Sequence, residues 1–593
     1  MFKLPNITGG NKRRFEPATE DAIKKVRLHD ESSYNNDEQQ ISRDKGKGKA
    51  VTIADEEDEV EYINAHDDDD NNDDNEDEDG RFFGGGLTDQ QKEILDVFDK
   101  AERNVNEINL TPQNIRKQLM KFDKCIRKNV ELRGKYPDDP NSFIESEIDL
   151  DESIHELKNF SQNPSMAFSQ LLKNVEILEK IVNLLSHENT DIALDVVEVL
   201  EELTDDDILE EINIDRDDIL QTFVDKLLEY QLLELLISNL GRLNENLDTD
   251  IQGVFHTLSL IENLLSLRPS LSESICEQTP ILSWLINRLN QSTFNQNKQY
   301  TSEILSILLQ NSKKNKLNFV SNIDNIDIVL KSISKYKNIN PKDGEELEYL
   351  ENLFNILCSL LLENEVKTKF NKLEGIELMV LIAQQKKLIS SYRSIKVLDH
   401  ALSNEENSEK FININGLKIL FGFFMNKSSN SFKNSQLSFQ DLEEHILGIL
   451  VSLFTNIPSE TSNRIRLLKK FVENDYEKVD KLLEFKSNSE NRLNKFFNNH
   501  DFNELDEDDI YLQKLEFGLF SLQLSSYILA WLIMEDDGIK DHIQLLLQRN
   551  GQTFNNIIEV LKEYSDNMGD EKQNEELSQK DIVNNLIEYL ISL

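Results

Sequence analysis

The stretch HENTDIALDVVEVLEELTD, from His187 to Asp205, decides the fold. Asn189 or Thr190 can cap a helix here, because short polar side chains accept hydrogen bonds from the free N–H groups at a helix start. The apolar residues that follow have helical spacing and predict one buried stripe: Ile192, Val196, Val199, Leu200 and Leu203. Acidic residues form a second stripe on another face of the same helix: Asp195, Glu198 and Glu202. The stretch therefore predicts a helix with one apolar face and one acidic face.

Comparable helices recur along the chain at a nearly constant interval. Their approximate centres are Val196, Leu258, Leu305, Phe354, Val397 and Leu450. After a wider first gap the interval is about 43 to 53 residues, close to the ~40–47 residues of HEAT and armadillo units. Shorter apolar helices precede several of them, at Val175–Leu185, Leu232–Leu240 and Gly416–Met425. Because such a helix pair cannot bury its apolar faces alone, neighbouring pairs must stack. The sequence predicts an all-α, right-handed α-solenoid of the armadillo/HEAT type.

Composition excludes several other classes. The 593 residues include only 10 prolines and 20 glycines, too few for sandwiches or barrels that turn every ~8–12 residues. Acidic residues outnumber basic ones by 111 to 65, which gives a net charge of −46. Such a surface repels phosphate backbones, so we expect no direct nucleic-acid partner. A homodimer is compatible with the sequence.

The cysteines and the apolar runs indicate the cellular compartment of the protein. Cys125, Cys276 and Cys358 lie far apart and form no CxxC pair, which favours a reducing compartment. The longest apolar runs, such as Tyr527–Met534, fall short of the ~18 residues that cross a bilayer. No apolar signal segment follows the N-terminal charges. We therefore expect a soluble intracellular protein with no membrane partner.

The chain divides by composition into four regions. We expect a disordered tail at residues 1–86, an N-terminal helical cap at 87–160, armadillo-type repeats at 161–460 and a C-terminal helical region at 461–593. The tail contains sixteen acidic residues and no Lys or Arg between Asp55 and Asp79, a run too charged to fold alone.

Three further segments have a predicted local structure. The Asn/Ser-rich inserts Asn426–Gln440 and Lys486–Asn503 are expected to be surface loops with no packing role. Tyr511–Met534 reads as one long helix of the C-terminal cap.

Two short patterns resemble transport signals. Lys12 and Arg13 are followed by ten residues and then by Lys24, Lys25 and Arg27, which is the spacing of a bipartite nuclear import signal. The alternative is a chance cluster in a charged tail, and the exposed position favours the signal. The spacing of Phe168, Leu171, Val175 and Ile177 matches a leucine-rich export signal. The inner face of a helix has the same spacing, and for these four residues we favour core packing.

Catalytic and metal-binding patterns are missing from the sequence. The nine histidines form no HExxH or other metal-ligand spacing, and no GxSxG, kinase or GxGxxG motif occurs. His400 reads as a packing or surface residue rather than a base. We expect no enzyme activity, no metal and no cofactor.

Several strings, taken together, resemble one family. They are YPDDPNSFIESEIDLDESIHEL (Tyr136 to Leu157), HENTDIALDVVEVLEELTD, ENLFNILCSLL (Glu351 to Leu361), IKVLDHAL (Ile395 to Leu402), ENDYEKVDKLLEF (Glu473 to Phe485) and YLQKLEFGLFSLQ (Tyr511 to Gln523). Their order from about residue 110 to 570 is similar to that of the beta-catenin-like protein 1 family. The resemblance implies an armadillo superhelix and a nuclear, spliceosome-associated protein of the Nineteen Complex. It also implies partners with basic localisation-signal segments, including the cell-division-cycle-5-like splicing factor, and an import receptor that binds the tail. The two Asn/Ser-rich inserts and a longer, more acidic tail depart from the family pattern.

An armadillo fold lines its concave wall with the last helix of each repeat. On those helices the sequence offers acidic and amide side chains, which we predict to form an acidic groove for basic peptides: Glu198, Glu202, Glu262, Asn263, Glu303, Glu351, Asn352 and Asp399. Ordinary solvated helix faces are the alternative explanation of these charges.

Two other binding classes use the same fold. A transport receptor of the importin alpha type reads basic signals with a repeated Trp-x-x-x-Asn ladder, but Trp284 and Trp531 are the two tryptophans here and neither has Asn four residues later. A beta-catenin-type adaptor needs a basic groove, whereas residues 87–593 carry a net charge of −34. The non-catalytic splicing scaffold is therefore favoured, with the importin-alpha-like adaptor as the alternative.

Overall fold

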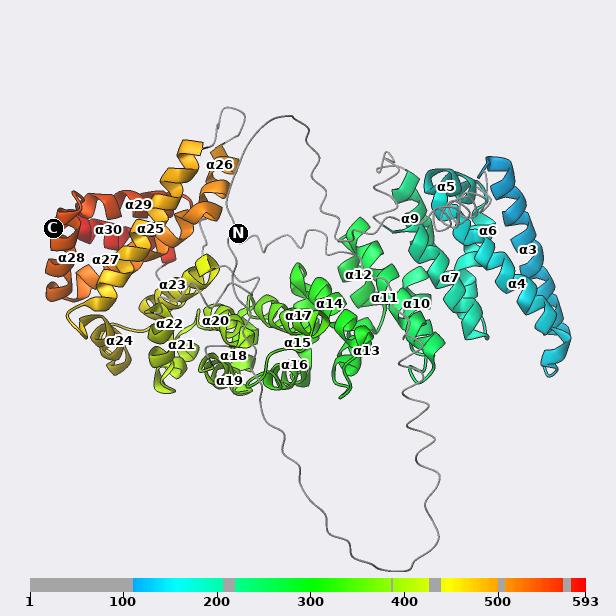
Figure 1. The fold of residues 1–593 in the computed structure, drawn as a ribbon, viewed down its shortest axis with the longest axis horizontal. Coiled ribbons are helices and arrows are strands. Elements are labelled where there is room, and N and C mark those ends of the chain that lie inside the picture. Colours follow the sequence, from blue (N-terminus) through cyan, green and yellow to red (C-terminus); the bar gives the residue numbers. More distant parts are fainter. Residues whose placement is uncertain (1–109, 206–218, 386–387, 426–438, 500–506, 569–577) are drawn as a thin grey trace, which may run out of the picture. The chain divides into compact units, whose positions relative to one another are not determined.

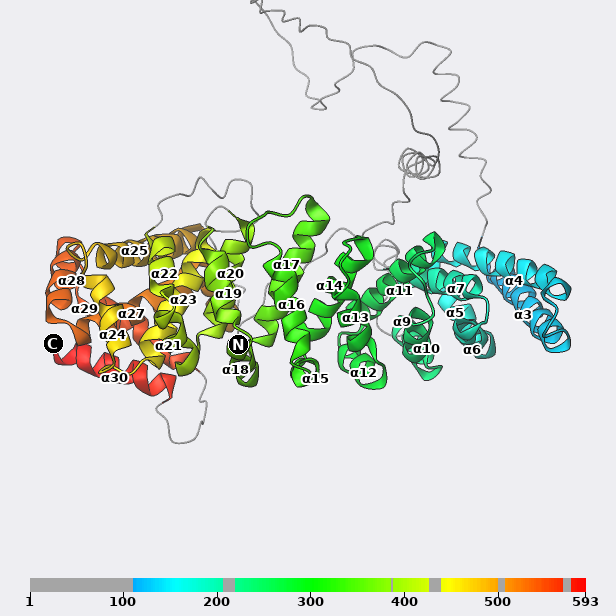
Figure 2. The same ribbon diagram turned by 90° about the horizontal axis from the view of Figure 1, so that it is seen from below.

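The computed structural model describes residues 110–205, 219–385, 388–425, 439–499, 507–568 and 578–593. Over these ranges the regular structure is helical and contains no strand. The predicted all-α class is confirmed. From α3 to α30, successive groups of helices follow one another in chain order (Figures 1 and 2).

The described chain begins with an antiparallel helix pair. Thr111 caps α3 (Pro112–Lys135) by accepting a hydrogen bond from the Asn114 N–H at 3.3 Å, and Pro112 occupies the first turn, where a missing N–H costs nothing. Short 3₁₀ turns at Pro140–Ser142 and Lys158–Gln162 flank α4 (Ile144–Leu157), which packs along α3.

Groups of three helices make up the middle of the described chain. They are α5 (Pro164–Lys173), α6 (Val175–Asn183) and α7 (Thr190–Leu203); α9 (Ile219–Glu229), α10 (Leu232–Leu240) and α11 (Asp248–Leu267); α12 (Leu271–Gln278), α13 (Ile281–Leu289) and α14 (Gln296–Gln310); α15 (Lys313–Ser321), α16 (Asp324–Ser334) and α17 (Gly344–Leu360); α18 (Asn364–Lys372), α19 (Gly375–Ala383) and α20 (Ile389–Ala401); α21 (Glu405–Asn413), α22 (Gly416–Phe424) and α23 (Phe439–Asn456). Each third helix packs on the third helix of the next group. The six predicted helix centres lie in these third helices, and α10 has the predicted bounds. The armadillo-type α-solenoid is confirmed.

The same backbone turn precedes the second helix of more than one group. Glu374 before α19 and Asn415 before α22 both take left-handed φ values, of 58° and 67°. The glycine that follows each lets a phenylalanine lie against the backbone, because a Cβ on Gly375 or Gly416 would stand 2.4 Å from the ring of Phe370 or Phe411. The recurrence of this turn reflects the internal repeat.

The C-terminal region is built around one apolar helix. Its elements are α24 (Ser462–Val472), α25 (Glu477–Asn499), α26 (Glu507–Lys514), α27 (Phe520–Glu535), α28 (Asp537–Arg549), α29 (Phe554–Asp566) and α30 (Gln579–Ser592). α27 contacts α23, α25, α28, α29 and α30. A helix that is apolar on all sides is stable in water only when it is surrounded in this way.

Two local predictions in this region are wrong. Lys486–Asn499 is not a loop but the second half of α25, because Ser489, Leu493 and Phe496 continue the buried stripe of that helix. Tyr511–Met534 is not one regular helix either. A π-helical turn at Leu515–Leu519 interrupts it, and Gly518 takes a φ of 114° that side chains rarely adopt. Most of the other insert, residues 426–438, lies outside the described residues.

Among the described residues, one stretch passes the length and composition test for a membrane span, although each of its uninterrupted apolar runs is short. It is Asp509–Glu535, and 78% of its most apolar window is buried inside the fold. That burial is the environment of the core helix of a folded domain.

Candidate partner-binding wall

Five consecutive third helices carry the predicted groove residues. We call α7, α11, α14, α17 and α20 the third-helix wall. Each helix packs on the next, so side chains far apart in sequence come to neighbouring helices. Apolar residues hold the wall together, as with Val196, Leu258 and Leu305, which are all at most 1% exposed.

Glu198 and Glu202 lie at the start of the wall, on α7. The Glu198 carboxylate accepts a hydrogen bond and ion pair from the Lys158 ammonium at 2.5 Å. Burial raises the pKa of Glu202, and the charge of Lys158 opposes that shift. Both side chains are half-buried, so a partner's cation can reach them.

Glu262 and Asn263 lie on α11 and have different roles. The Tyr300 hydroxyl of α14 donates to Glu262 at 2.5 Å, while the half-buried carboxylate keeps part of its surface open. Asn263 is only 2% exposed, and its amide donates to the Glu201 carbonyl at 3.2 Å. The structure therefore removes Asn263 from the set of side chains available to a partner, because its amide is already used between α7 and α11.

The middle of the wall is joined by amide contacts. The Gln299 amide of α14 reaches both Glu303 of its own helix and Glu348 of α17, each at 3.4 Å. Asn352 of α17 donates to the Ser302 hydroxyl of α14 at 3.2 Å. Glu303 and Asn352 are half-buried.

At the far end of the wall, each carboxylate contacts a basic side chain of the next helix. Glu351 of α17 forms an ion pair with Arg393 of α20. Asp399 of α20 lies 3.0 Å from His445 Nδ1 of α23. Gly448 permits this approach, because a Cβ there would stand 2.3 Å from Asp399 Oδ1.

Sequence reasoning missed the histidine on the wall. His256 Nδ1 of α11 lies 2.6 Å from the Glu201 carboxylate of α7. Burial opposes protonation of His256, but the hydrogen bond and charge of Glu201 outweigh it and raise its pKa. The two residues are 55 positions apart in sequence and lie on different helices, so no local motif predicts the pair.

His400 and the cysteines occupy packing positions. Burial lowers the pKa of His400 to about 4, so the imidazole is neutral at pH 7. The three cysteines are free thiols: Cys125 is half-buried, while Cys276 and Cys358 are buried. Burial raises the pKa of Cys276 to about 12 and that of Cys358 to about 11, which makes both poor nucleophiles.

One side-chain cluster has the chemistry to ligate a cation. Asp151 and His155 of α4 and Asp195 of α7 place ligand atoms within 4.8 Å of one another. Burial and the neighbouring Asp151 raise the pKa of Asp195 to about 8. Asp151 and His155 are four residues apart on one helix, which is the only local signal of the cluster. It requires Asp195 from a separate helix, so the sequence spacing did not predict it.

The two predicted transport signals have different outcomes. Lys12, Arg13, Lys24, Lys25 and Arg27 lie outside the described residues. The export-like residues are divided between two helices, with Phe168 and Leu171 buried on α5. On α6, Val175 is 36% exposed and Ile177 is half-buried. A break at Asn174 separates the pairs.

Comparison with known proteins identifies the family of this chain. The catenin-beta-like family, described as Arm-motif containing and nuclear, matches residues 92–562. The chain belongs to this family. The beta-catenin-like protein 1 homolog of Schizosaccharomyces pombe is 35% identical over 82% of this chain and 85% of its own length. Beta-catenin-like protein 1 of Homo sapiens is 36% identical over 78% of this chain and 83% of its own length.

The solved structures that match this chain are more distant. A chain from a structure of the cadherin and beta-catenin interaction is 13% identical, with a TM-score of 0.43 over 75% of this chain and 77% of its own. A chain from the SYS-1/POP-1 complex is 11% identical, with a TM-score of 0.45 over 79% of this chain and 85% of its own.

Proposed function

We propose that this chain is a non-catalytic nuclear scaffold of the pre-mRNA splicing machinery, associated with the Nineteen Complex, that binds basic localisation-signal-like segments along the third-helix wall. One observation carries the proposal: five consecutively packed helices of a nuclear Arm-motif family member each present a partly exposed carboxylate. The splicing role comes from the resemblance to the beta-catenin-like protein 1 family.

The spacing of the wall defines the ligand. Packed helices lie about 8–10 Å apart, and an extended peptide in the polyproline II conformation has about three residues per turn and advances about 3.1 Å per residue. A Lys or Arg at every third position of such a segment would therefore lie on one side and meet one carboxylate per helix. Each carboxylate accepts several hydrogen bonds, so Glu262 can keep Tyr300 while it accepts a partner's ammonium group.

Affinity must come from several contacts acting together. A single exposed ion pair contributes only about 0–1 kcal/mol, and added salt screens it. Binding by the wall should therefore be weak for short basic peptides, strong for long ones, and steeply dependent on salt.

A charge reversal tests the wall. The double variant Glu262→Lys/Glu303→Lys should weaken binding of a fluorescent peptide with Lys at every third position by about tenfold or more at low salt, measured by anisotropy. Glu460→Lys/Glu559→Lys is the matched control, because both residues are exposed and lie off the wall. Normal binding by the first variant with unchanged helix content would exclude the wall and direct attention to the C-terminal helices.

The importin-alpha-like adaptor is disfavoured by where the tryptophans lie. Trp284 lies on α13, the second helix of its group. Trp531 lies on α27, with the Arg464 guanidinium 4.6 Å from its ring. Affinity purification from nuclear extract separates the two functions: splicing factors should co-elute, and import factors in their place would favour the adaptor.

A further inference from the structure

α3 is strongly basic in an acidic protein, and the neighbouring helix α4 pairs with only some of its cations. The helix carries eight Lys or Arg residues and two acidic ones. Three cations pair with carboxylates of α4: Lys121 with Glu156, Lys128 with Asp149 and Arg133 with Glu147. Packing against α4 explains these three cations but not the others.

The outward side of α3 carries a row of cations and apolar side chains. We call Lys117, Met120, Lys124, Arg127 and Val130 the α3 basic stripe. The spacing of three and four residues places all five on one side of the helix over about 20 Å. One carboxylate shares this side, because Glu131 follows Arg127 by four residues. Met120 and Val130 are each 63% exposed. Lys117 and Lys124 are exposed and form no ion pair within the described part of the chain.

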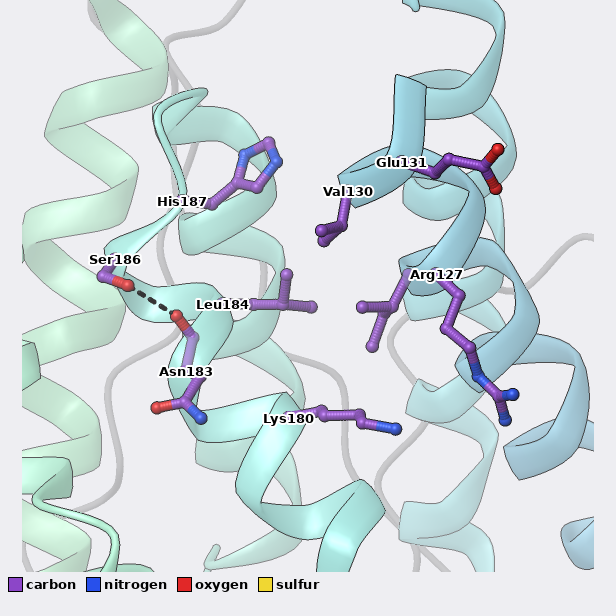
Figure 3. Close-up of a pocket in the computed structure, with 9 residues that line it drawn as sticks. Arg127, Val130, Glu131, Lys180, Asn183, Leu184, Ser186 and His187 are labelled. Carbon is purple, nitrogen blue, oxygen red and sulfur yellow. Dashed lines mark hydrogen bonds between the residues drawn. The ribbon is translucent and has the colours of Figure 1, made fainter. Parts of the chain in front are cut away.

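A groove runs beside this stripe, between α3 and the end of α6. Its volume is about 550 Å³. Ile126 and Val130 of α3 line one side, and Leu184 lines the other. Val130 and Leu184 face each other across the gap, while Lys180 reaches from α6 toward α3 (Figure 3). Glu131 also lines the groove, with its carboxylate turned away from the gap (Figure 3), and this one carboxylate offsets only part of the charge of the three stripe cations.

A buried carboxylate fixes the cations at the lower end of the groove. Asp123 is 7% exposed and pairs with both Arg127 of its own helix and Lys180 of α6, the latter at 2.5 Å. Two cations share one carboxylate, so the rim keeps a positive charge. The Arg127 side chain remains 73% exposed, which leaves its guanidinium accessible to an anionic ligand.

We propose that the α3 basic stripe and the groove beside it dock an acidic amphipathic helix of a partner protein, with the partner's apolar row seated on Val130, Met120 and Leu184 and its carboxylates on Lys117, Lys124 and Arg127. The site is separate from the third-helix wall and has the opposite charge. The same scaffold thus binds a basic segment at one surface and an acidic segment at another.

The apolar residues identify the class of ligand. A nucleic-acid backbone would use the three cations but would leave Met120 and Val130 against water or phosphate. A helix laid in a groove instead uses anchors at every third and fourth position, which is the spacing of the stripe itself. About 14 residues of helix cover 20 Å, so a short partner segment is sufficient.

The test uses the full chain and a defined probe. A fluorescein-labelled peptide of about 14 residues, with Leu at every third and fourth position and Glu between, should bind the wild-type protein, and added salt should weaken binding. Lys117→Glu/Lys124→Glu should weaken it about tenfold, which is ~1.4 kcal/mol. Val130→Asp should weaken it similarly. Lys372→Glu/Lys418→Glu, at exposed lysines of α18 and α22, is the matched control and should bind as wild type.

Other outcomes would overturn the proposal. Equal binding of a peptide with Lys in place of Glu, or normal binding by Lys117→Glu/Lys124→Glu, would contradict charge recognition. Binding of poly-uridine that is lost in Lys117→Glu/Lys124→Glu but kept in Val130→Asp would identify a nucleic-acid surface instead. A wild-type dimer that becomes a monomer in Lys117→Glu/Lys124→Glu by light scattering would identify a second copy as the occupant. Helix content measured by circular dichroism checks that both variants are folded. Because both variants keep the third-helix wall, their binding of the basic peptide then tests the proposed function separately.

Discussion

Arg464 of α24 and Glu535 of α27 form a buried ion pair within the C-terminal region. The Arg464 Nε atom lies 2.9 and 3.0 Å from the two carboxylate oxygens, across 71 residues of sequence. Arg464 is 0% exposed, and its guanidinium lies 4.6 Å from the ring centroids of both Phe454 and Trp531. The guanidinium also donates to the Phe454 and Ile457 carbonyls. One side chain thus joins α23, α24 and α27.

Removing Arg464 should destabilise the C-terminal region strongly. Arg464→Ala leaves the Glu535 carboxylate buried without its partner, and such losses cost about 3–5 kcal/mol. Urea unfolding followed by tryptophan fluorescence in a Trp284→Phe background, in which Trp531 beside the guanidinium is the reporter, should show the midpoint fall. Asp537→Asn, which breaks an exposed pair with Lys540, should leave the midpoint unchanged. A similar midpoint for Arg464→Ala and wild type would contradict the structural role of the pair.

Gly253 controls the packing of α11 on α7. A Cβ at this position would lie 2.4 and 2.5 Å from the two Cδ atoms of Leu194, so Gly253→Ala overfills the contact and should cost about 1–3 kcal/mol. That penalty exceeds the gain of about 1 kcal/mol in helix propensity. Gly344→Ala is the control, since nothing lies within 4 Å of its Cβ position, and it should be neutral or stabilising. Thermal unfolding that ranks the two variants the other way would contradict this packing.

His256 should make the protein more stable at mildly acidic pH. Its folded-state pKa is raised by Glu201 above the ordinary value of 6.5, despite the opposing effect of burial. The pair therefore stabilises the fold fully below pH 6.5, and this contribution is lost as the pH rises through the raised pKa. The difference in thermal midpoint between wild type and His256→Gln should grow as the pH falls from 8.5 to 5.5. Parallel pH profiles would show that the pair does not contribute.

His400 should have the opposite effect. Burial lowers its folded-state pKa to about 4, so the folded protein favours the neutral imidazole. Its contribution is present above pH 6.5 and is lost as the pH falls from 6.5 to 4. His400→Gln should therefore be less acid-sensitive than wild type over this window, as measured by urea midpoints at each pH. Equal acid sensitivity of the two proteins would mean that His400 protonates without cost.

The import signal is tested in cells. Replacing Lys12, Arg13, Lys24, Lys25 and Arg27 by Ala should abolish nuclear accumulation of a fluorescent fusion, because both basic clusters of a bipartite signal are needed. Arg43→Ala/Lys45→Ala removes basic charge outside the pattern and should have no effect. Nuclear accumulation of the five-residue variant in cells depleted of its splicing partners would contradict the signal.

The local sequence pattern was sufficient to predict most helices. It was misleading where the backbone departs from a regular α-helix. The apolar stripe Leu232–Leu240 predicted α10 with its bounds, because its apolar residues recur with helical spacing over the length of one short helix. The stripe across Tyr511–Met534 continues through Gly518, so periodicity alone could not locate the π-helical turn there. Asn and Ser between Lys486 and Asn499 suggested a loop, yet tertiary packing of Leu493 and Phe496 kept that segment in α25.

The sequence by itself determined most of the helical segments and which face of each is apolar, because both follow from the 3.6-residue period and the cost of exposing apolar surface. Only the tertiary structure decided what each polar side chain contacts. Asn263 looked like a groove residue from its place beside Glu262, but the packing of α11 on α7 buries it against the Glu201 carbonyl. The Arg464–Glu535 pair and the groove beside Val130 likewise arise between helices distant in sequence. Their geometry depends on how whole helices cross, and no local spacing in the chain encodes that crossing.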